Sequence, residues 1–222
     1  MTKPQHNHKS IPVASIKENE ISVWLKSERY LATKRIIDVI LSIVLIATLF
    51  IPVLLIVLFI RIESNGNPIF KQERIGRHGE PFIMYKLRTM RINSEKTSAS
   101  FAGANDVRIT KLGKFLRRTR IDETPQLMNV LIGDMSLIGP RPEQSKLITE
   151  IYQHIPEFTL REIVRPGITG WAQVNQGYVD NIKSSKTKLE FDLFYIKNIS
   201  LFLDLKILML TLGTLIHGRG AR

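Results

Sequence analysis

Hydrophobic residues form one long uninterrupted run near the start of the chain, at residues 39–60. The run carries no charge, and as a straight helix it would be about 33 Å long, which is enough to cross the hydrocarbon core of a bilayer. A buried helix of a soluble protein would be expected to show a polar stripe, which is missing here. The run is also too long, and starts too late, for a signal peptide. The pattern therefore predicts insertion into a membrane.

Pro52 lies inside this run and leaves two arrangements open. The proline removes the amide that would bond the carbonyl of Thr48, so a kink or a break is expected there. Basic residues flank the run on both sides, so the distribution of charge gives no orientation for a single span. A proline-kinked span and a segment that enters and leaves on the same face both agree with the pattern.

The remaining chain shows shorter patterns of helix and strand. Two strand patterns at residues 68–75 and 81–87 are joined by a glycine-containing turn, which predicts a β-hairpin. Thr110 and Thr124 are expected to cap helices, the second of which should end at Gly133. Helical patterns cover residues 21–35, 110–121, 124–133, 143–163 and 201–216. The predicted fold is α+β, mostly helical with a small β-hairpin, and it includes amphipathic helices at the membrane interface.

The charge of the chain adds an anionic partner to this picture. The formal net charge is +12, and residues 61–120 hold 14 Lys and Arg against 5 Asp and Glu. Such an excess suits nucleic acid, anionic lipid or a phosphorylated substrate. Aromatic residues are not interleaved with the basic residues, which argues against single-stranded nucleic acid. Because the chain has no cysteine, disulfides and thiolate metal sites are excluded.

The adjacent acids Asp122 and Glu123 are the first candidates for chemistry, and they fall between two predicted helices. A junction of this kind can direct both carboxylates into one cavity, where they could hold Mg²⁺ or where one could attack an electrophile. The alternative is helix capping, because acids just before a helix N-terminus interact favourably with the helix dipole. Taken alone, the pair fits capping more often than catalysis.

Basic residues elsewhere in the chain favour phosphate chemistry at this pair. Lys86 and Arg88 lie at the end of a predicted strand, and Arg141 is held between Pro140 and Pro142. An arginine with so stiff a backbone suits bidentate binding of phosphate. The alternative is a solvated basic face beside anionic lipid, as in a membrane-anchored module without enzymatic activity.

Four motifs in one order resemble the bacterial sugar transferases, the monotopic phosphoglycosyl transferases. These motifs are residues 86–90 (KLRTM), 121–126 (IDETPQ), 133–142 (GDMSLIGPRP) and 165–171 (RPGITGW). The resemblance implies a tail and amphipathic lead-in at residues 1–33 and a re-entrant membrane hairpin at residues 34–62, broken at Pro52. Residues 63–222 would then form a cytoplasmic catalytic domain with a membrane-associated C-terminal helix.

The resemblance also implies a reaction at the cytoplasmic face of the bacterial inner membrane. The family transfers a sugar-1-phosphate from a UDP-sugar to undecaprenyl phosphate and releases UMP, which initiates assembly of a surface polysaccharide or glycoconjugate. Asp122 would be the nucleophile that forms a covalent phospho-sugar intermediate, with Glu123 as its partner and Mg²⁺ bound at the pair. Membrane lipid is a further expected partner, nucleic acid is not, and a homodimer is compatible with the sequence. The residues expected to bind substrate or phosphate are Lys86, Arg88, Arg117, Gln126, Pro140, Arg141 and Pro142.

Overall fold

The computed structural model of the protein describes residues 28–91, 106, 108–176 and 182–216. Its α-helices are α2 (Glu28–Glu63), α3 (Lys111–Thr119), α4 (Gln126–Ile132), α5 (Ser145–His154), α6 (Trp171–Asn175), α7 (Ile182–Lys197) and α8 (Leu201–Ile216). Three 3₁₀ segments are η2 (Arg77–Gly79), η4 (Ile121–Glu123) and η5 (Pro156–Ile163). The strands are β1 (Ile69–Ile75), β2 (Pro81–Leu87), β3 (Ser136–Ile138) and β4 (Gly167–Thr169).

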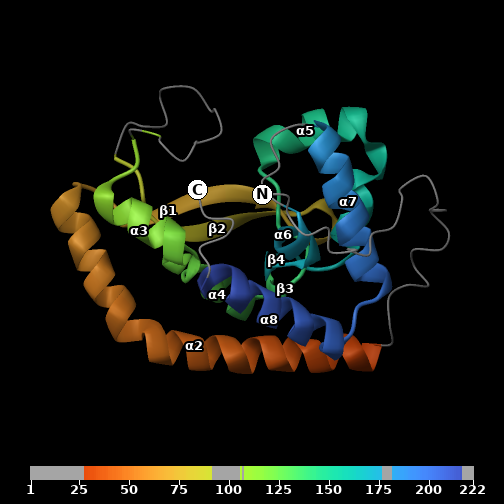
Figure 1. The fold of residues 1–222 in the computed structure, drawn as a ribbon, viewed down its shortest axis with the longest axis horizontal. Coiled ribbons are helices and arrows are strands. Elements are labelled where there is room, and N and C mark those ends of the chain that lie inside the picture. The colour runs from red at the N-terminus through yellow and green to blue at the C-terminus, as the bar shows by residue number, and fades with distance from the viewer. Residues whose placement is uncertain (1–27, 92–105, 107, 177–181, 217–222) are drawn as a thin grey trace, which may run out of the picture.

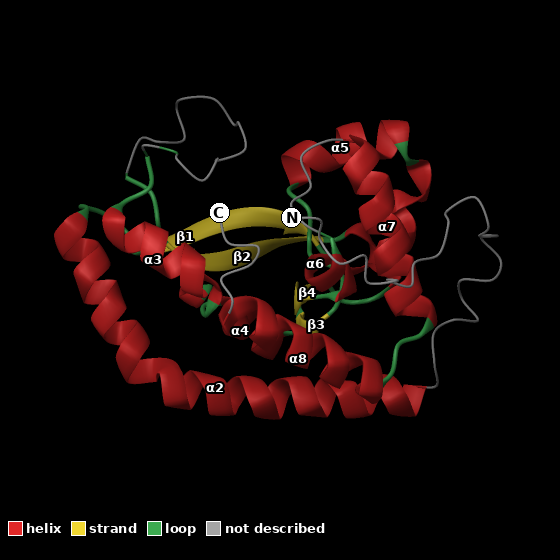
Figure 2. Cartoon of the chain, viewed as in Figure 1, coloured by secondary structure: helices red, strands yellow, loops and turns green. Residues whose placement is uncertain are grey.

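These elements confirm a mostly helical α+β fold with a small antiparallel hairpin. Figure 1 shows α2 along one side of the molecule, with α4 and α8 next to it, while the β1–β2 hairpin crosses the middle. Helices α5 and α7 lie at one end of the hairpin and α3 at the other (Figure 2). The main core lies between η5, α7 and α8, where the fully buried side chains include Phe158, Leu189, Leu193, Tyr195, Ile196 and Ile207.

The apolar run forms part of one continuous helix, α2, which passes through Pro52. Figure 1 shows this helix bend from a long leg beside α8 into a shorter leg that reaches α3. A proline inside a helix removes a hydrogen bond and crowds the preceding turn, which accounts for a bend of this kind. Within the described residues, α2 alone is long and apolar enough to cross a membrane. The re-entrant hairpin predicted at residues 34–62 is not confirmed, because the chain forms one bent helix there.

Polar contacts fasten the first leg of α2 to the rest of the protein. Lys34 binds the carboxylate of Asp204 in α8 at 2.7 Å. Arg35 donates to two backbone carbonyls at the end of α4, at 2.5 and 2.9 Å. Asp38 is buried and accepts a hydrogen bond from the hydroxyl of Ser136 in β3 at 2.7 Å. Arg35 and Asp38, three residues apart on this helix, therefore bind different elements of the domain.

Apolar contacts fasten the second leg. Ile60 is buried in a small cluster with Leu87 of β2 and Leu116 of α3. The carboxylate of Glu63, at the end of α2, accepts a hydrogen bond from the backbone amide of Leu112 at 3.3 Å. Both legs of the bent helix are thus attached to the same globular part of the chain.

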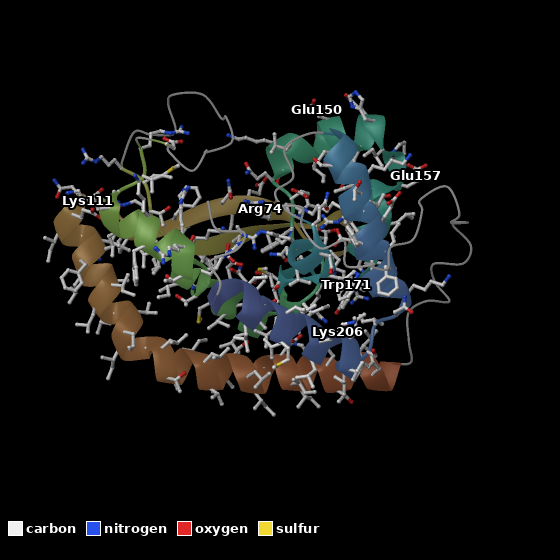
Figure 3. All side chains as sticks on the ribbon, viewed as in Figure 1. Arg74, Lys111, Glu150, Glu157, Trp171 and Lys206 are labelled. Atoms are coloured by element: carbon white, nitrogen blue, oxygen red, sulfur yellow. The ribbon has the colours of Figure 1, made fainter. Side chains whose placement is uncertain are left out.

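A large apolar surface remains exposed on α2 and α8. Figure 3 shows many side chains of α2 projecting away from the rest of the molecule. Helix α8 buries Leu203 and Ile207, whereas Phe202 on its other side is 79% exposed. Contiguous apolar surfaces of this kind mark membrane or protein contacts. The exposed side chains include Ile40, Val44, Ile51, Leu54, Leu55, Phe59, Leu205, Met209 and Leu212.

The sequence did not predict the second sheet, in which β3 and β4 pair in parallel. The amide of Gly139 donates to the carbonyl of Thr169, and the amide of Gly167 donates to the carbonyl of Pro140, both at 2.9 Å. A Cβ atom placed on Gly167 would lie 2.1 Å from the backbone nitrogen of Gly139. The two glycine-containing motifs are therefore in direct backbone contact.

Two helix predictions need correction. The single helix expected at residues 143–163 is divided at Ile155 into α5 and the 3₁₀ segment η5. Pro156 accounts for the division, because a proline disfavours helical conformation in the residue before it. Thr124 does not cap α4, since its hydroxyl donates to the carbonyl of Ile121. The N-cap is Pro125, and Gly133 ends the helix with φ of 109°, as predicted.

Candidate active site

The acidic pair lies in a short 3₁₀ turn between α3 and α4. Thr110 caps α3 by accepting a hydrogen bond from the amide of Gly113 at 2.9 Å. The helix ends where Arg120 adopts a left-handed conformation, with φ of 59°. This turn carries Asp122 and Glu123 into the protein, where each is 7% exposed. The junction therefore buries both carboxylates, as the functional interpretation required.

Glu123 is surrounded by cations. Its carboxylate binds Arg141 at 2.5 and 3.3 Å and the ammonium group of Lys86 at 3.1 Å, and Arg120 lies 3.7 Å away. Burial favours a raised pKa for Glu123, but Arg141 and Lys86 outweigh burial and hold this pKa well below its ordinary value. Glu123 is consequently an anion whose oxygens already have partners.

Asp122 differs from its neighbour. Its buried Oδ1 atom has no hydrogen-bond partner in the described structure. Burial, and then the negative charge of Glu123, raises the pKa of Asp122 to about 6, against the opposing influence of Lys86, Arg141 and Arg117. A buried carboxylate with an unpaired oxygen and a raised pKa is a good candidate for a nucleophile or base.

Two other predicted residues lie around this turn. Gln126 is fully buried, and neither polar atom of its side chain has a partner among the described residues. An unpaired buried amide costs about 1–3 kcal/mol, so a ligand that bonded it would be stabilised. Arg117 bonds the hydroxyl of Thr89 at 2.9 Å, and its charge acts on the pKa of Asp122.

Arg88 is not brought to the acidic pair. Its guanidinium donates to the carbonyl of Ser64, just after the end of α2. Lys86, two residues earlier on β2, binds Glu123 instead. The side chains of alternate strand residues share one face, but Arg88 lies just past the end of β2, and its guanidinium reaches the Ser64 carbonyl instead.

The loop at residues 140–142 presents Arg141 to Glu123, while its prolines contribute backbone carbonyls. The carbonyl of Pro142 accepts a hydrogen bond from the guanidinium of Arg74 at 2.9 Å. Burial, and then the charge of Arg141, lowers the pKa of Arg74 to about 10. Figure 3 shows Arg74 near the centre of the molecule, where the hairpin meets the second half of the chain.

Asn129, which was not predicted from the sequence, fixes the strand that carries Lys86. The Asn129 amide donates to the carbonyl of Ile83 at 2.7 Å and accepts from the backbone amide of Tyr85 at 3.2 Å. These two hydrogen bonds take the place of bonds that a neighbouring strand would make to the free edge of β2. A polar residue among the apolar positions of α4 was the available signal.

The residues present are compatible with Mg²⁺ in part. In the described ranges, no three Asp, Glu or His side chains form a cluster that could hold a metal ion. The Oδ1 atom of Asp122 and the side-chain oxygen of Gln126 are unpaired oxygens, the ligand type that Mg²⁺ prefers. Glu123, the other predicted ligand, has its oxygens bound to Lys86 and Arg141. The geometry thus fits a metal at Asp122 better than a metal shared by both acids.

Comparison with known protein families identifies the relatives of this chain. The family described as bacterial sugar transferase matches residues 29–218. The chain belongs to the bacterial sugar transferase family. The matched region contains α2, the acidic pair, the loop at residues 140–142 and α8.

Several members of the bacterial sugar transferase family have names that state a reaction. A UDP-N-acetylgalactosamine-undecaprenyl-phosphate N-acetylgalactosaminephosphotransferase of Aeromonas hydrophila is 44% identical over 96% of this chain and 50% of its own length. A UDP-glucose:undecaprenyl-phosphate glucose-1-phosphate transferase of Escherichia coli is 43% identical over 80% of this chain and 39% of its own. The uncharacterized sugar transferase EpsL of Bacillus subtilis is 40% identical over 84% of this chain and 89% of its own. The chain thus spans half or less of the first two of these relatives.

Proposed function

We propose that the protein transfers a sugar-1-phosphate from a UDP-sugar to undecaprenyl phosphate, with release of UMP. Membership of the bacterial sugar transferase family and the names of its relatives support this reaction. The observation that carries the proposal is the buried oxygen of Asp122, which is unpaired beside a cluster of cations. Such a site can bring a nucleophile to an anionic phosphate.

In the first step, a carboxylate oxygen of Asp122 attacks the sugar-linked phosphorus of the donor. The bond from that phosphorus to the oxygen of UMP breaks, and the electron pair leaves with UMP. Two like unit charges 4 Å apart repel by about 4 kcal/mol at an effective dielectric constant of 20. Arg141, Lys86 and Arg117 offset this repulsion and stabilise the charge that develops on the phosphate oxygens.

In the second step, a phosphate oxygen of the lipid acceptor attacks the phosphorus held on Asp122. The bond to Asp122 breaks, the carboxylate is restored, and a lipid diphosphate sugar leaves. Glu123 holds Arg141 and Lys86 in place when no phosphate is bound. When Mg²⁺ is bound at Asp122, it would neutralise part of the diphosphate charge.

The attachment of α2 supports a re-entrant membrane segment. The first leg is bonded to α4, β3 and α8, and the second leg to β2 and α3. Because both legs contact one globular domain, we infer that both ends of the helix lie on the same face of the membrane. That face would be the cytoplasmic face of the inner membrane, where the donor is found and assembly of a surface polysaccharide would start.

The decisive test is Asp122→Asn in purified protein supplied with undecaprenyl phosphate. Wild-type protein should release UMP from one of UDP-N-acetylgalactosamine, UDP-glucose or UDP-galactose, and a chelator should abolish this release. The Asn variant should lose at least about a thousandfold in rate, because it removes the nucleophile. It should also fail to retain labelled sugar phosphate on the protein. Full activity in this variant would rule out the assigned nucleophile.

The matched control for an acidic site residue is Glu150→Gln. Glu150 is exposed on α5 (Figure 3), whereas the acidic pair lies in the turn between α3 and α4, so its replacement by an amide should leave the rate unchanged.

A further inference from the structure

A buried arginine, Arg161, forms a hydrogen bond with the backbone of Arg141. Arg161 lies in η5 and is 4% exposed. Its Nε atom donates to the carboxylate of Asp192 at 2.8 Å, and a terminal nitrogen donates to the backbone carbonyl of Arg141 at 2.6 Å. A buried charge is costly unless it is paired and hydrogen-bonded. Arg161 meets this condition by joining α7 to the loop that carries Arg141.

Three successive carbonyls of this loop are each held by a different element. The Pro140 carbonyl accepts from the amide of Gly167 in β4, and the Arg141 carbonyl accepts from Arg161 in η5. The Pro142 carbonyl accepts from Arg74 in β1. The loop is thus immobilised through its backbone, while the Arg141 side chain remains directed at Glu123.

The hydrogen bond from Arg161 restricts a backbone orientation that the two prolines leave variable. Each proline ring restricts its own φ angle, and Pro142 biases Arg141 toward an extended conformation. The orientation of the peptide that follows Arg141 still varies within this extended region. A hydrogen bond to the Arg141 carbonyl fixes that orientation. It thereby helps to fix the backbone position from which the Arg141 side chain extends.

A second ion pair braces the same region. Glu143, which follows the loop, is bound by Lys188 of α7, and a terminal nitrogen of Arg161 lies 3.9 Å from its carboxylate. Asp192 and Lys188 are both buried on α7. These four side chains form one buried ionic network behind the loop.

We propose that Arg161 is a positioning residue for the transfer reaction, acting through the backbone of Arg141. By holding the Arg141 carbonyl from within the buried ionic network, it sets where the Arg141 guanidinium meets the phosphates of the donor. The inference rests on the proposed function, in which Arg141 binds phosphate. Arg161 itself touches no substrate.

The test is Arg161→Lys, which keeps a cation beside Asp192. One ammonium group cannot replace the planar guanidinium that bonds both Asp192 and the Arg141 carbonyl. We expect kcat/KM for the UDP-sugar to fall about tenfold or more, mainly through kcat, because the contact with phosphate strengthens as charge develops. In an Arg141→Lys background, the same change should cost less than about twofold, since the positioned group is already altered.

The matched control is Arg77→Lys. Arg77 also donates from Nε to a backbone carbonyl, that of Ile163 at 3.0 Å, but it does not touch the loop at residues 140–142. Its replacement should leave kcat/KM within about twofold. If Arg161→Lys fails to fold, the double variant Arg161→Gln with Asp192→Asn removes both charges of the buried pair and leaves neither uncompensated. That double variant should show the same non-additive loss with Arg141→Lys.

The possible outcomes separate the two proposals. Undiminished activity of Arg161→Lys, or a loss that is fully additive with Arg141→Lys, would overturn the positioning role and leave the proposed function intact. An additive loss would mean that Arg161 supports the fold in general. Absence of transfer by the wild-type protein with every donor would overturn the proposed function and the positioning role together.

Discussion

Two neighbouring carboxylates, Asp122 and Glu123, share one buried turn and yet have opposite electrostatic environments. Glu123 faces Arg141 and Lys86, which keep it ionised. Asp122 is buried beside that anion, and its Oδ1 atom has no partner in the described structure. Environments that separate the pKa values of paired acids allow one acid to react while the other organises the site. Under the proposed function, this arrangement would account for two acids, rather than one, at the junction.

The pKa of Asp122 predicts how the rate should depend on pH. This pKa is raised to about 6, so the carboxyl is protonated below that pH and cannot attack. At Mg²⁺ concentrations too low to saturate the site, we expect kcat/KM to rise with pH through an acid limb near pH 6 and then to level off, because kcat/KM reports ionisations of the free enzyme. Mg²⁺ bound at Asp122 would favour the carboxylate, so saturating Mg²⁺ should move this limb to lower pH. Rate measurements from pH 4.5 to 8 would show this limb, and an unchanged rate down to pH 4.5 would contradict the assignment.

Glu123→Gln should move the same acid limb to lower pH. The substitution removes a negative charge that raises the pKa of Asp122, and it releases Arg141 and Lys86 to act on Asp122. We also expect a lower maximal rate, because those two cations lose their anchor. The control Glu150→Gln should leave both the limb and the maximum in place. A limb that stays near pH 6 in Glu123→Gln would show that another group titrates there.

Residues at the centre of the site could be predicted from sequence, but those that support it could not. Asp122 and Arg141 stand in recognisable motifs beside prolines and helix signals. Arg161 and Asn129 form hydrogen bonds with backbone atoms of distant segments, and such contacts produce no characteristic spacing of residues in the sequence. Arg88 has the right charge, but its guanidinium bonds the backbone carbonyl of Ser64, just after α2, and no sequence pattern indicates that contact.

At the scale of elements, the parallel pair β3–β4 holds the loop of Arg141 through glycine contacts. Gly167→Ala should destabilise the fold by about 1–3 kcal/mol or more, since the added Cβ would overlap the backbone of Gly139 and backbone atoms cannot move aside easily. Chemical or thermal unfolding in detergent would measure the change. A stability equal to that of the wild-type protein would contradict the tight packing of these strands.

Gly213→Ala provides the control for that substitution. Gly213 lies inside α8, and a Cβ placed there meets no atom of the described structure within 4 Å beyond its chain neighbours and the backbone of its own helix. Alanine favours a helix over glycine by up to about 1 kcal/mol, so this variant should be neutral or slightly more stable.

Elements with a local signal were predicted, and elements defined by distant contacts were not. The hairpin follows from two alternating strands around a turn that includes Gly79, which adopts φ of 78°. Helix α3 follows from its Thr110 cap. Strands β3 and β4 have three residues each and are separated by α5 and η5, so no local period marks them.

At the scale of the whole molecule, the two attachments of α2 predict which side of the membrane each flank occupies. The chain has no cysteine, so single cysteines at Ser22, before α2, and Glu80, exposed in the hairpin turn, can be labelled selectively. Both should react with an impermeant thiol reagent only after the cells are opened. Labelling of the two positions on opposite faces would establish a single span and contradict the re-entrant arrangement.

The sequence could not decide this arrangement, because an apolar run of the same length suits a span as well as a re-entrant segment. The contacts from which we infer a re-entrant segment join residues far apart in the chain, such as Lys34 with Asp204 and Asp38 with Ser136. Lys34 and Asp38, polar residues just before the apolar run, were the sequence signal available for such contacts. Their partners became evident only when the folded domain placed α8 and β3 against the helix.

If α2 lies in the membrane as proposed, its double attachment would also fix the height of the active site above the bilayer. A catalytic domain on a flexible tether would sample many heights above the membrane. A bent helix attached through both legs would hold the domain at a single height. Lipid phosphates of any tail length present their headgroup at the same depth. A rigid mount of this kind would therefore make the enzyme tolerant of shorter polyprenyl tails, and leave acceptor selection to the phosphate end of the lipid.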